Sequence, residues 1–262
     1  MRIPLAAVLV ATSMTLVAAE ARAAPPWVER RETLPGGNWA FDVGLGLGHV
    51  PDRTAAGVNM EMAVGLTEHV ELGVRTGLRL ADDQSRGIEP DNYGRLFDRQ
   101  YFDGGASPVA NPELRVRWGF LSGGVAEVGL EGRFIAPIEA GTYAGIAPGL
   151  PIALHLGDSV RLDTGVWMPF IFGPNHTAVG ISVPVDIWIQ VTSRVWLGPM
   201  TGLASPDISP PFGNSITLVS MGFGVGYQIT HYLDFKSMFL FPGLNQDSRY
   251  FGVGAGVQIR IE

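Results

Sequence analysis

The chain has 262 residues, a formal net charge of −7 and no cysteine, so disulfides cannot contribute to its stability. Its acidic balance argues against a nucleic-acid partner, which would require a basic face. Hydrophobic residues make up 46% of the chain and glycine contributes 35 residues. Beyond the N-terminal stretch, however, no apolar run approaches the roughly 18 residues that a membrane helix needs.

The first 23 residues have the features of a secretory signal peptide. Arg2 gives a positive start, residues 3–19 are apolar, and Ala21-Arg22-Ala23 is a small-x-small cleavage signal. We therefore expect export and cleavage near Ala23; a retained membrane anchor is the alternative. Cleavage would leave 16 basic and 24 acidic residues, a formal charge of −8. Residues 24–38 would then form a periplasmic lead-in.

The next segments alternate strictly between apolar and polar residues. In a strand over residues 70–80, Val70, Leu72 and Val74 share one face, whereas Glu71, Gly73 and Arg75 share the other. The preceding run, residues 57–66, follows the same rule, and residues 67–69 form a tight turn between the two. The pair is predicted to be a β-hairpin.

This hairpin pattern recurs along the chain, with short polar turns centred near residues 68, 123, 158, 193 and 231. The pattern predicts twelve strands. They cover residues 39–48, 57–66, 70–80, 112–120, 125–135, 149–156, 160–170, 179–191, 195–204, 215–229, 232–241 and 250–261.

The connections alternate between the short turns and longer loops at residues 49–56, 81–111, 136–148, 171–178, 205–214 and 242–249. An even strand number with short turns on one side resembles the outer-membrane β-barrels of Gram-negative bacteria. The resemblance implies an all-β fold over residues 39–262: a closed, antiparallel, up-and-down transmembrane barrel of about twelve strands. It also implies an outer-membrane location, both termini in the periplasm, contact with the lipid bilayer and lipopolysaccharide, and insertion by the barrel-assembly machinery. The oligomeric state stays open.

Two observations bear on this resemblance. Members of the class commonly end in an aromatic residue, whereas this chain ends in Glu262. A soluble β-sandwich or a lipocalin-like barrel also shows alternation, but with the apolar set facing a core. Aromatic residues near the expected strand ends could form interface girdles: Trp39, Trp118, Phe120, Tyr227 and Tyr232 at the short turns, and Trp167, Phe170, Phe172, Phe239, Phe241 and Tyr250 at the loops.

In a membrane barrel the apolar set faces lipid and the alternate set lines the lumen. The lumen should then be nearly neutral, with a dense charged wall on the third to fifth strands. Residues predicted to line the lumen and to form a candidate constriction are Glu61, Glu71, Arg75, Arg79, Arg115, Arg117, Glu127, Glu131, Arg133, Arg161, Asp163 and Asp186.

Glycines alternate along three other strands, at residues 44–48, 222–226 and 252–256. They indicate either open space for a channel or relief of crowding in a curved sheet. The longest loop, residues 81–111, is either a solvated surface loop or a lid that folds inward. Asp82, Asp83 and Asp91 could supply oxygens to Ca²⁺, but they lack a recognised loop spacing.

Three functions remain open. The first is a porin-like channel for small hydrophilic solutes. The second is a closed structural or surface-binding barrel with an ion-paired lumen. The third is a membrane-embedded hydrolase, which would depend on His155 or His176. His69 and His231 fall in turns, His49 and His176 fall in external loops, and only His155 is predicted to face inward. The chain has no G-x-S-x-G, HExxH or Walker motif, so we expect no enzyme, no cofactor and no metal.

Overall fold

The computed structural model describes residues 25–50, 53–79, 109, 111–138, 143–173, 175, 177–205, 208, 217–245, 249 and 251–261, without the side chains of residues 50, 53–55 and 79. Some expectations therefore lie outside the described residues: the signal peptide, nearly all of the 81–111 loop with its three aspartates, His176, Tyr250 and Glu262. The side chain of Arg79 also lies outside the described part of the chain.

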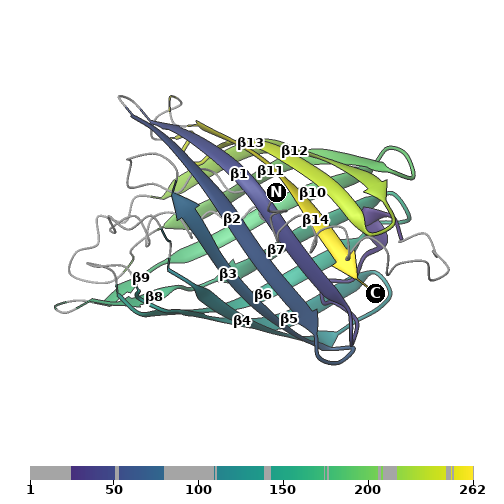
Figure 1. The fold of residues 1–262 in the computed structure, drawn as a ribbon, viewed down its shortest axis with the longest axis horizontal. Coiled ribbons are helices and arrows are strands. Elements are labelled where there is room, and N and C mark those ends of the chain that lie inside the picture. Colours follow the sequence, from purple (N-terminus) through teal and green to yellow (C-terminus); the bar gives the residue numbers. More distant parts are fainter. Residues whose placement is uncertain are drawn as a thin grey trace, which may run out of the picture.

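The described strands form one closed antiparallel barrel (Figure 1). Strands follow one another in chain order, the first pairs with the last, and Trp39 lies opposite Ile261. The strands are β1 (Trp39–Val50), β2 (Arg53–Gly65), β3 (Val70–Arg79), β4 (Glu113–Leu121), β5 (Ala126–Ile135), β6 (Gly145–His155), β7 (Val160–Trp167), β8 (Phe170–Phe172), β9 (Thr177–Val179), β10 (Ile181–Gln190), β11 (Val195–Ser205), β12 (Leu218–Thr230), β13 (Leu233–Phe241) and β14 (Phe251–Ile261).

These fourteen segments make a barrel of twelve strands, as predicted. β7 and β8 both pair with β6 and are parts of one strand, and β9 and β10 are parts of the next. The first interruption falls at Met168-Pro169, where proline has no N–H for the ladder. Neighbouring groups still bond there: the Met168 N–H donates to the Pro148 carbonyl at 2.9 Å, and the Gly180 N–H to the Pro169 carbonyl at 2.8 Å.

The prediction of a loop over residues 49–56 is wrong. β1 extends to Val50 and β2 starts at Arg53, with His49 opposite Thr54. His49 is therefore a strand residue whose ring lies 5.1 Å from that of Phe251. Cross-strand pairing carries the hairpin further than its apolar alternation does, since backbone hydrogen bonds do not depend on side-chain polarity.

The short turns lie together at the end of the barrel where the chain ends, which we call the short-turn end (Figure 1). Before β1, residues 27–29 form a short 3₁₀ helix, η1 (Trp27–Glu29). Within the described part of the chain, no helix has the length and apolar character needed to cross a bilayer.

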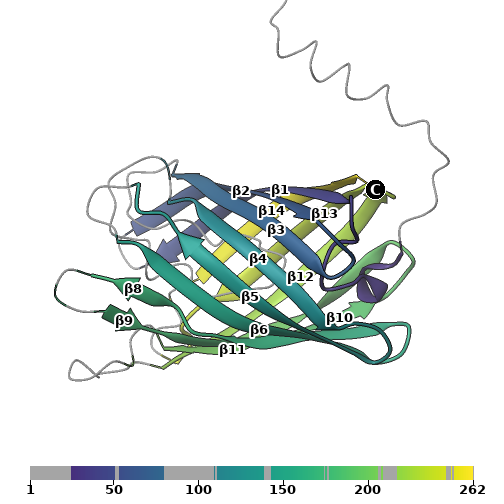
Figure 2. The same ribbon diagram turned by 90° about the horizontal axis from the view of Figure 1, so that it is seen from below.

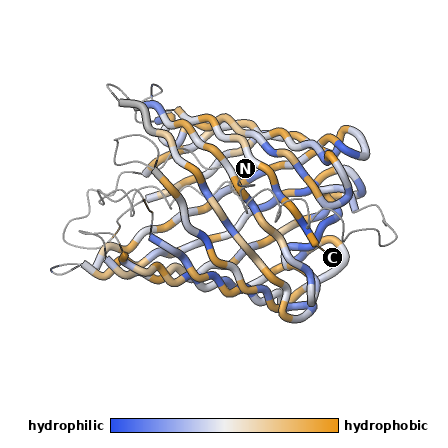
Figure 3. The backbone as a smooth tube through the Cα atoms, viewed as in Figure 1, coloured by the Kyte–Doolittle hydropathy of each residue, from blue (hydrophilic) through white to orange (hydrophobic). Residues whose placement is uncertain are grey.

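Most apolar side chains of the strands point outward, and the tube of Figure 3 shows the alternation of apolar and polar residues along the strands. Val74, Val116 and Leu130 are 40%, 46% and 48% exposed, whereas their chain neighbours Arg75, Arg117 and Glu131 are buried. An apolar exterior around a charged interior suits a barrel in hydrocarbon. The sandwich alternative fails because there is one closed sheet, and the lipocalin-like alternative fails because the apolar set is outside.

Aromatic residues follow the girdle prediction in part. Trp39, Trp118 and Phe120 are exposed near the short-turn end, and Phe172 and Phe239 toward the opposite end. The prediction that Trp167 belongs to an interface girdle is wrong, because its side chain points into the barrel. It is 2% exposed, and its indole N–H donates to Glu131 at 3.0 Å.

Because Val74 faces outward near the middle of β3, Val74→Arg should destabilise the protein by about 2–4 kcal/mol in a lipid bilayer. Urea unfolding in lipid vesicles measures this cost. Spin labels provide the matched comparison. A label at position 74 should be reached by oxygen and not by a water-soluble nickel reagent. A label at position 75 should not show this preference for oxygen. Equal water access at both positions would contradict the membrane assignment.

Candidate functional site

Charged side chains gather inside the barrel on β2 to β7 and on β10, which pairs with β7. Glu71, Arg75, Arg115, Arg117, Glu127, Glu131, Arg133, Arg161, Asp163 and Asp186 are all buried, and Glu61 is nearly so. Eleven of the twelve residues predicted to line the lumen therefore lie inside, and the twelfth is Arg79, whose side chain is not described. Their role as a constriction remains a prediction.

The structure joins these charges in ion pairs between strands of the wall. Arg115 on β4 lies 2.8 Å from Glu61 of β2 and 2.7 Å from Glu71 of β3. Arg117 lies 2.6 Å from Glu131 of β5. Because every one of these groups is shielded from bulk water, each charge depends on its partners to offset the loss of hydration.

The network continues along β5 and β7. Arg133 contacts Glu131 at 2.9 Å and Glu113 at 3.3 Å, and Arg161 contacts Asp163 at 2.6 Å. Glu113 is 3% exposed and was missed in the sequence analysis, although it lies two residues before Arg115 and so shares its face.

The N-terminal segment, residues 25–38, runs inside the short-turn end of this wall. η1 lies within that end of the barrel in Figure 2, and Trp27, Val28, Arg30, Glu32 and Thr33 are all buried. The sequence analysis treated residues 24–38 only as a lead-in before the barrel. In the structure the buried residues of this segment lie inside the end of the barrel and narrow the lumen there.

Glu32 of the N-terminal segment joins two strands of the charged wall. Its carboxylate lies 3.0 Å from an Arg117 nitrogen and 2.8 Å from an Arg161 nitrogen. Its backbone N–H donates to Glu127 at 2.6 Å, and its carbonyl accepts from Arg117 at 2.7 Å. Charge-assisted hydrogen bonds of this kind are stronger than neutral ones.

Further bonds hold the rest of the segment. The Arg161 guanidinium also donates to the Arg30 carbonyl. His155 Nδ1 donates to the Val28 carbonyl at 2.7 Å, and His155 Nε2 lies 3.4 Å from Glu127. The Leu34 N–H donates to Glu71 at 2.9 Å. The one histidine predicted to face inward therefore contacts the N-terminal segment.

Arg30 binds the opposite side of the lumen. It donates to both oxygens of Asp234 on β13, at 2.6 Å and 3.3 Å, and Arg260 on β14 donates to the same carboxylate at 3.1 Å. Its guanidinium carbon also lies 5.1 Å from the Trp27 ring and 5.7 Å from the Trp196 ring, within the range of cation–π attraction.

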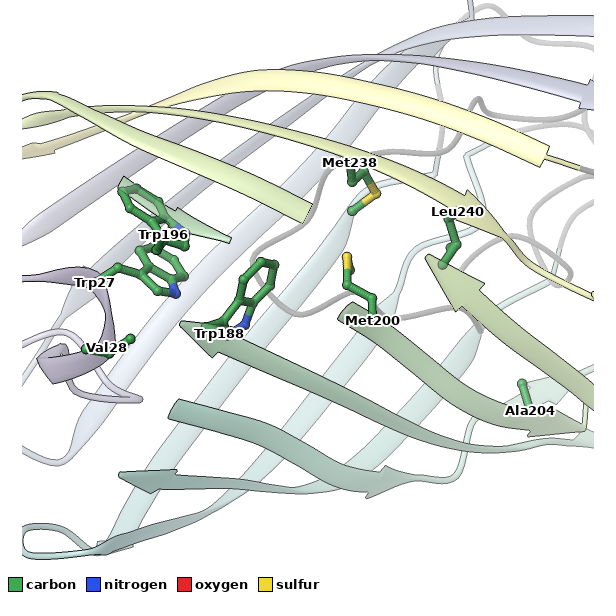
Figure 4. Close-up of a cluster of buried hydrophobic side chains, with 8 residues drawn as sticks. All are labelled: Trp27, Val28, Trp188, Trp196, Met200, Ala204, Met238 and Leu240. Carbon is green, nitrogen blue, oxygen red and sulfur yellow. The ribbon is translucent and has the colours of Figure 1, made fainter. Parts of the chain in front are cut away.

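On this side of the lumen, buried apolar side chains of β10, β11 and β13 gather in a cluster with Trp27 and Val28 (Figure 4). Trp27 of the N-terminal segment stacks on Trp196, with ring centroids 5.0 Å apart and planes 3° from parallel. Beside this stack lie Trp188 and, farther along the lumen, Met200. The cluster is completed by Val28, Ala204, Met238 and Leu240. The lumen thus combines a charged wall with an apolar cluster that lies near the buried Asp234, and the segment contacts both.

Two of the alternating glycines make room for this cluster. A Cβ at Gly226 would lie 2.0 Å from the Trp196 ring, and one at Gly224 would lie 2.6 Å from the Trp188 ring. On β12, therefore, the glycines relieve crowding by indole rings and do not leave open space.

A cavity of about 300 Å³ remains between the N-terminal segment and the barrel wall. The segment lines one side with Arg30 and Glu32, and β1, β2 and β14 line the other with Asp42, Glu61 and Gln258. Among the residues that the structure describes, no three His, Cys, Asp or Glu side chains come together as a metal site would require.

No protein-family model matches the sequence, and no curated protein matches it. Solved structures match the fold. The NanC porin superposes with a TM-score of 0.60 at 8% identity, covering 84% of this chain and 98% of the porin. The KdgM porin gives 0.59 at 8% identity, covering 85% and 99%. An outer-membrane channel from Pseudomonas putida F1 gives 0.58 at 10% identity, covering 89% and 98%.

The fold is that of an outer-membrane β-barrel. At these identities the similarity concerns the architecture alone, and it agrees with the resemblance seen in the alternation and hairpin repeat.

Proposed function

We propose that this chain is a porin-like channel of the outer membrane for small hydrophilic solutes. The observation that carries the proposal is a charged, hydrogen-bonding lumen wall enclosed by an apolar outer surface. Charged groups such as Arg115 and Glu71 offer a polar solute replacements for its water contacts, which the hydrocarbon core of a bilayer cannot provide. The names of the structural neighbours, two porins and a channel, support the same reading.

The charged wall also suggests which solutes would interact with it. One neighbour, the KdgM porin, has been solved in complex with oligogalacturonate, an oligomer of an acidic sugar. In this chain the arginines alternate in space with carboxylates, as in the Glu71, Arg115 and Glu61 contacts. Such a wall favours solutes that carry both donors and acceptors, such as sugars and their acids, over purely anionic ones.

A second function is favoured by the N-terminal segment. Because residues 25–38 bind both sides of the lumen, the resting barrel could be closed and serve a structural or surface-binding role. One double variant distinguishes the two functions. Arg75→Ala with Arg115→Ala removes two lumen cations, so a channel should shift its ion selectivity toward cations. A closed barrel should lose thermal stability without any change in permeability.

Planar-bilayer recordings on the purified, folded protein test the channel directly. We expect stepwise currents above background whose reversal potential in a salt gradient changes in the Arg75→Ala, Arg115→Ala variant. Arg31→Ala is the matched control, since Arg31 is exposed and pairs only at the surface with Glu68. No current above background from the protein or from a variant lacking the segment contacts would rule out the channel.

We infer no enzymatic role. His155 contacts the Val28 carbonyl and Glu127, which gives it a structural place beside the N-terminal segment. Loss of lipid or peptide hydrolysis in a His155→Ala variant would overturn this inference.

A further inference from the structure

We propose that Arg117 and Arg161 form a carboxylate-binding site in the lumen, which Glu32 occupies at rest and for which a carboxylate-bearing solute competes. The inference rests on the proposed channel function for its biological meaning. The site itself rests on the contacts of Glu32 alone.

The Glu32 carboxylate uses one oxygen for each arginine. Oε1 lies 3.0 Å from Arg117 Nη1, and Oε2 lies 2.8 Å from Arg161 Nη2. The arginines come from different strands, β4 and β7, and both are nearly inaccessible, at 0% and 4% exposure. Two buried guanidinium groups converging on one carboxylate make a specific anion site.

The barrel wall positions both arginines through contacts that do not involve the Glu32 carboxylate. Arg117 donates twice to Glu131, at 3.0 Å and 2.6 Å, and Arg161 donates to Asp163 at 2.6 Å. These wall carboxylates fix each guanidinium and leave further donors directed at the position of Glu32. Removing the Glu32 carboxylate therefore leaves these wall contacts in place and takes one carboxylate oxygen away from each arginine.

The ligand that occupies the site is displaceable, because it belongs to a segment with little regular structure. Apart from η1, residues 25–38 contain no helix or strand. The cavity beside the segment is lined by both Glu32 and Arg161, so a small solute in it lies next to the site. A solute carboxylate that replaces that of Glu32 removes one of the main contacts of the segment with the charged wall and loosens its hold on the lumen.

A thermal assay tests the site independently of conduction. We compare the wild type, Glu32→Ala and Glu29→Ala in detergent, with sodium acetate or sodium chloride at equal ionic strength. Glu29 is the control because it lies in the same segment and is exposed. Glu32→Ala should melt at a lower temperature in chloride, and acetate should raise its melting temperature. The wild type and Glu29→Ala should each have the same melting temperature in acetate as in chloride.

Further variants exclude a general salt effect. Glu32→Gln, which keeps the side-chain shape, should melt between wild type and Glu32→Ala. Adding Arg161→Gln to Glu32→Ala should abolish the acetate response. A Glu32→Ala protein that melts identically in acetate and chloride would overturn the site, whatever the protein conducts.

Bilayer currents test the competition. In the wild type, glucuronate should raise the fraction of time spent open, whereas glucose, which lacks only the carboxylate function, should not. In Glu32→Ala the open fraction should already be raised by about tenfold, which corresponds to about 1.4 kcal/mol. It should then be insensitive to glucuronate. If no variant conducts, the channel function fails while the thermal assay still decides the site. If the wild type responds equally to glucose and glucuronate, the competition is wrong.

Discussion

Replacing residues 27–34 with a glycine–serine stretch of the same length should raise the mean current through the reconstituted protein by about tenfold or more. The replacement removes the Trp27 stack on Trp196, the Arg30 contact with Asp234 and the Glu32 contacts with Arg117 and Arg161. Hydrogen bonds to charged groups contribute about 1.5–3 kcal/mol each, and about 1.4 kcal/mol shifts an equilibrium tenfold. Losing several of them should therefore free the lumen of the segment for most of the time.

The matched control keeps every buried contact. Glu29→Gly with Arg31→Gly changes two exposed residues of the same segment, and only Arg31 forms an ion pair, with the exposed Glu68. This double variant should conduct like the wild type. Access of a water-soluble thiol reagent to a cysteine at position 200, beside Trp188 in the lumen cluster, provides a second measurement. It should increase only in the glycine–serine variant. Equal currents and equal access in all three proteins would show that the segment does not restrict the lumen.

Arg117→Met should lower the free energy of unfolding by about 3–5 kcal/mol, the range found when one member of a buried ion pair is removed. Arg117 is fully buried and contacts Glu131 at 2.6 Å and Glu32 at 3.0 Å. Methionine fills a similar volume but leaves both carboxylates without that cation. Urea titration of the protein in lipid vesicles, followed by tryptophan fluorescence, measures the loss.

A second substitution separates lost charge from lost packing. Adding Glu131→Gln should recover part of the stability, because it removes the carboxylate that has lost Arg117 while Arg133 keeps its contact with Glu113. Arg31→Met, at an exposed pair, should change stability by no more than about 0.5 kcal/mol. If Arg117→Met lowered the free energy of unfolding by as little as Arg31→Met, water would have to reach the charged wall and screen its charges.

Several features could be read from local pattern alone. Strict alternation in residues 57–66 and 70–80 predicted β2, β3 and their tight turn, and the same rule located all twelve strands. It failed where pairing extends past the alternation, as at residues 49–56. A different prediction failed at Trp167, where aromatic character near a strand end indicated an interface, whereas the position in the strand places the ring inside. In that case the period of two was the better guide.

The partners of the lumen charges could be anticipated only for adjacent strands. Arg117 lies opposite Glu131 in the register of β4 and β5, so their contact follows from the hairpin. The role of Glu32 could not be anticipated in this way. It lies in a stretch with no alternation, and its partner Arg161 is 129 positions away in the chain. A buried charge in a segment before the first strand gives no local signal of its destination.

By itself, the sequence determined that the chain alternates, pairs into hairpins, turns its apolar residues to one face and its charges to the other, and closes with an even number of strands. Side-chain direction along a strand depends only on position, so those features are encoded locally. Only the tertiary structure decided that residues 25–38 enter the lumen, that Arg30 reaches Asp234 from 204 positions away, and that indole rings occupy the space left by Gly224 and Gly226. Those contacts exist because closing the barrel creates an enclosed volume, and buried charges and rings in that volume must be matched by whichever groups surround them.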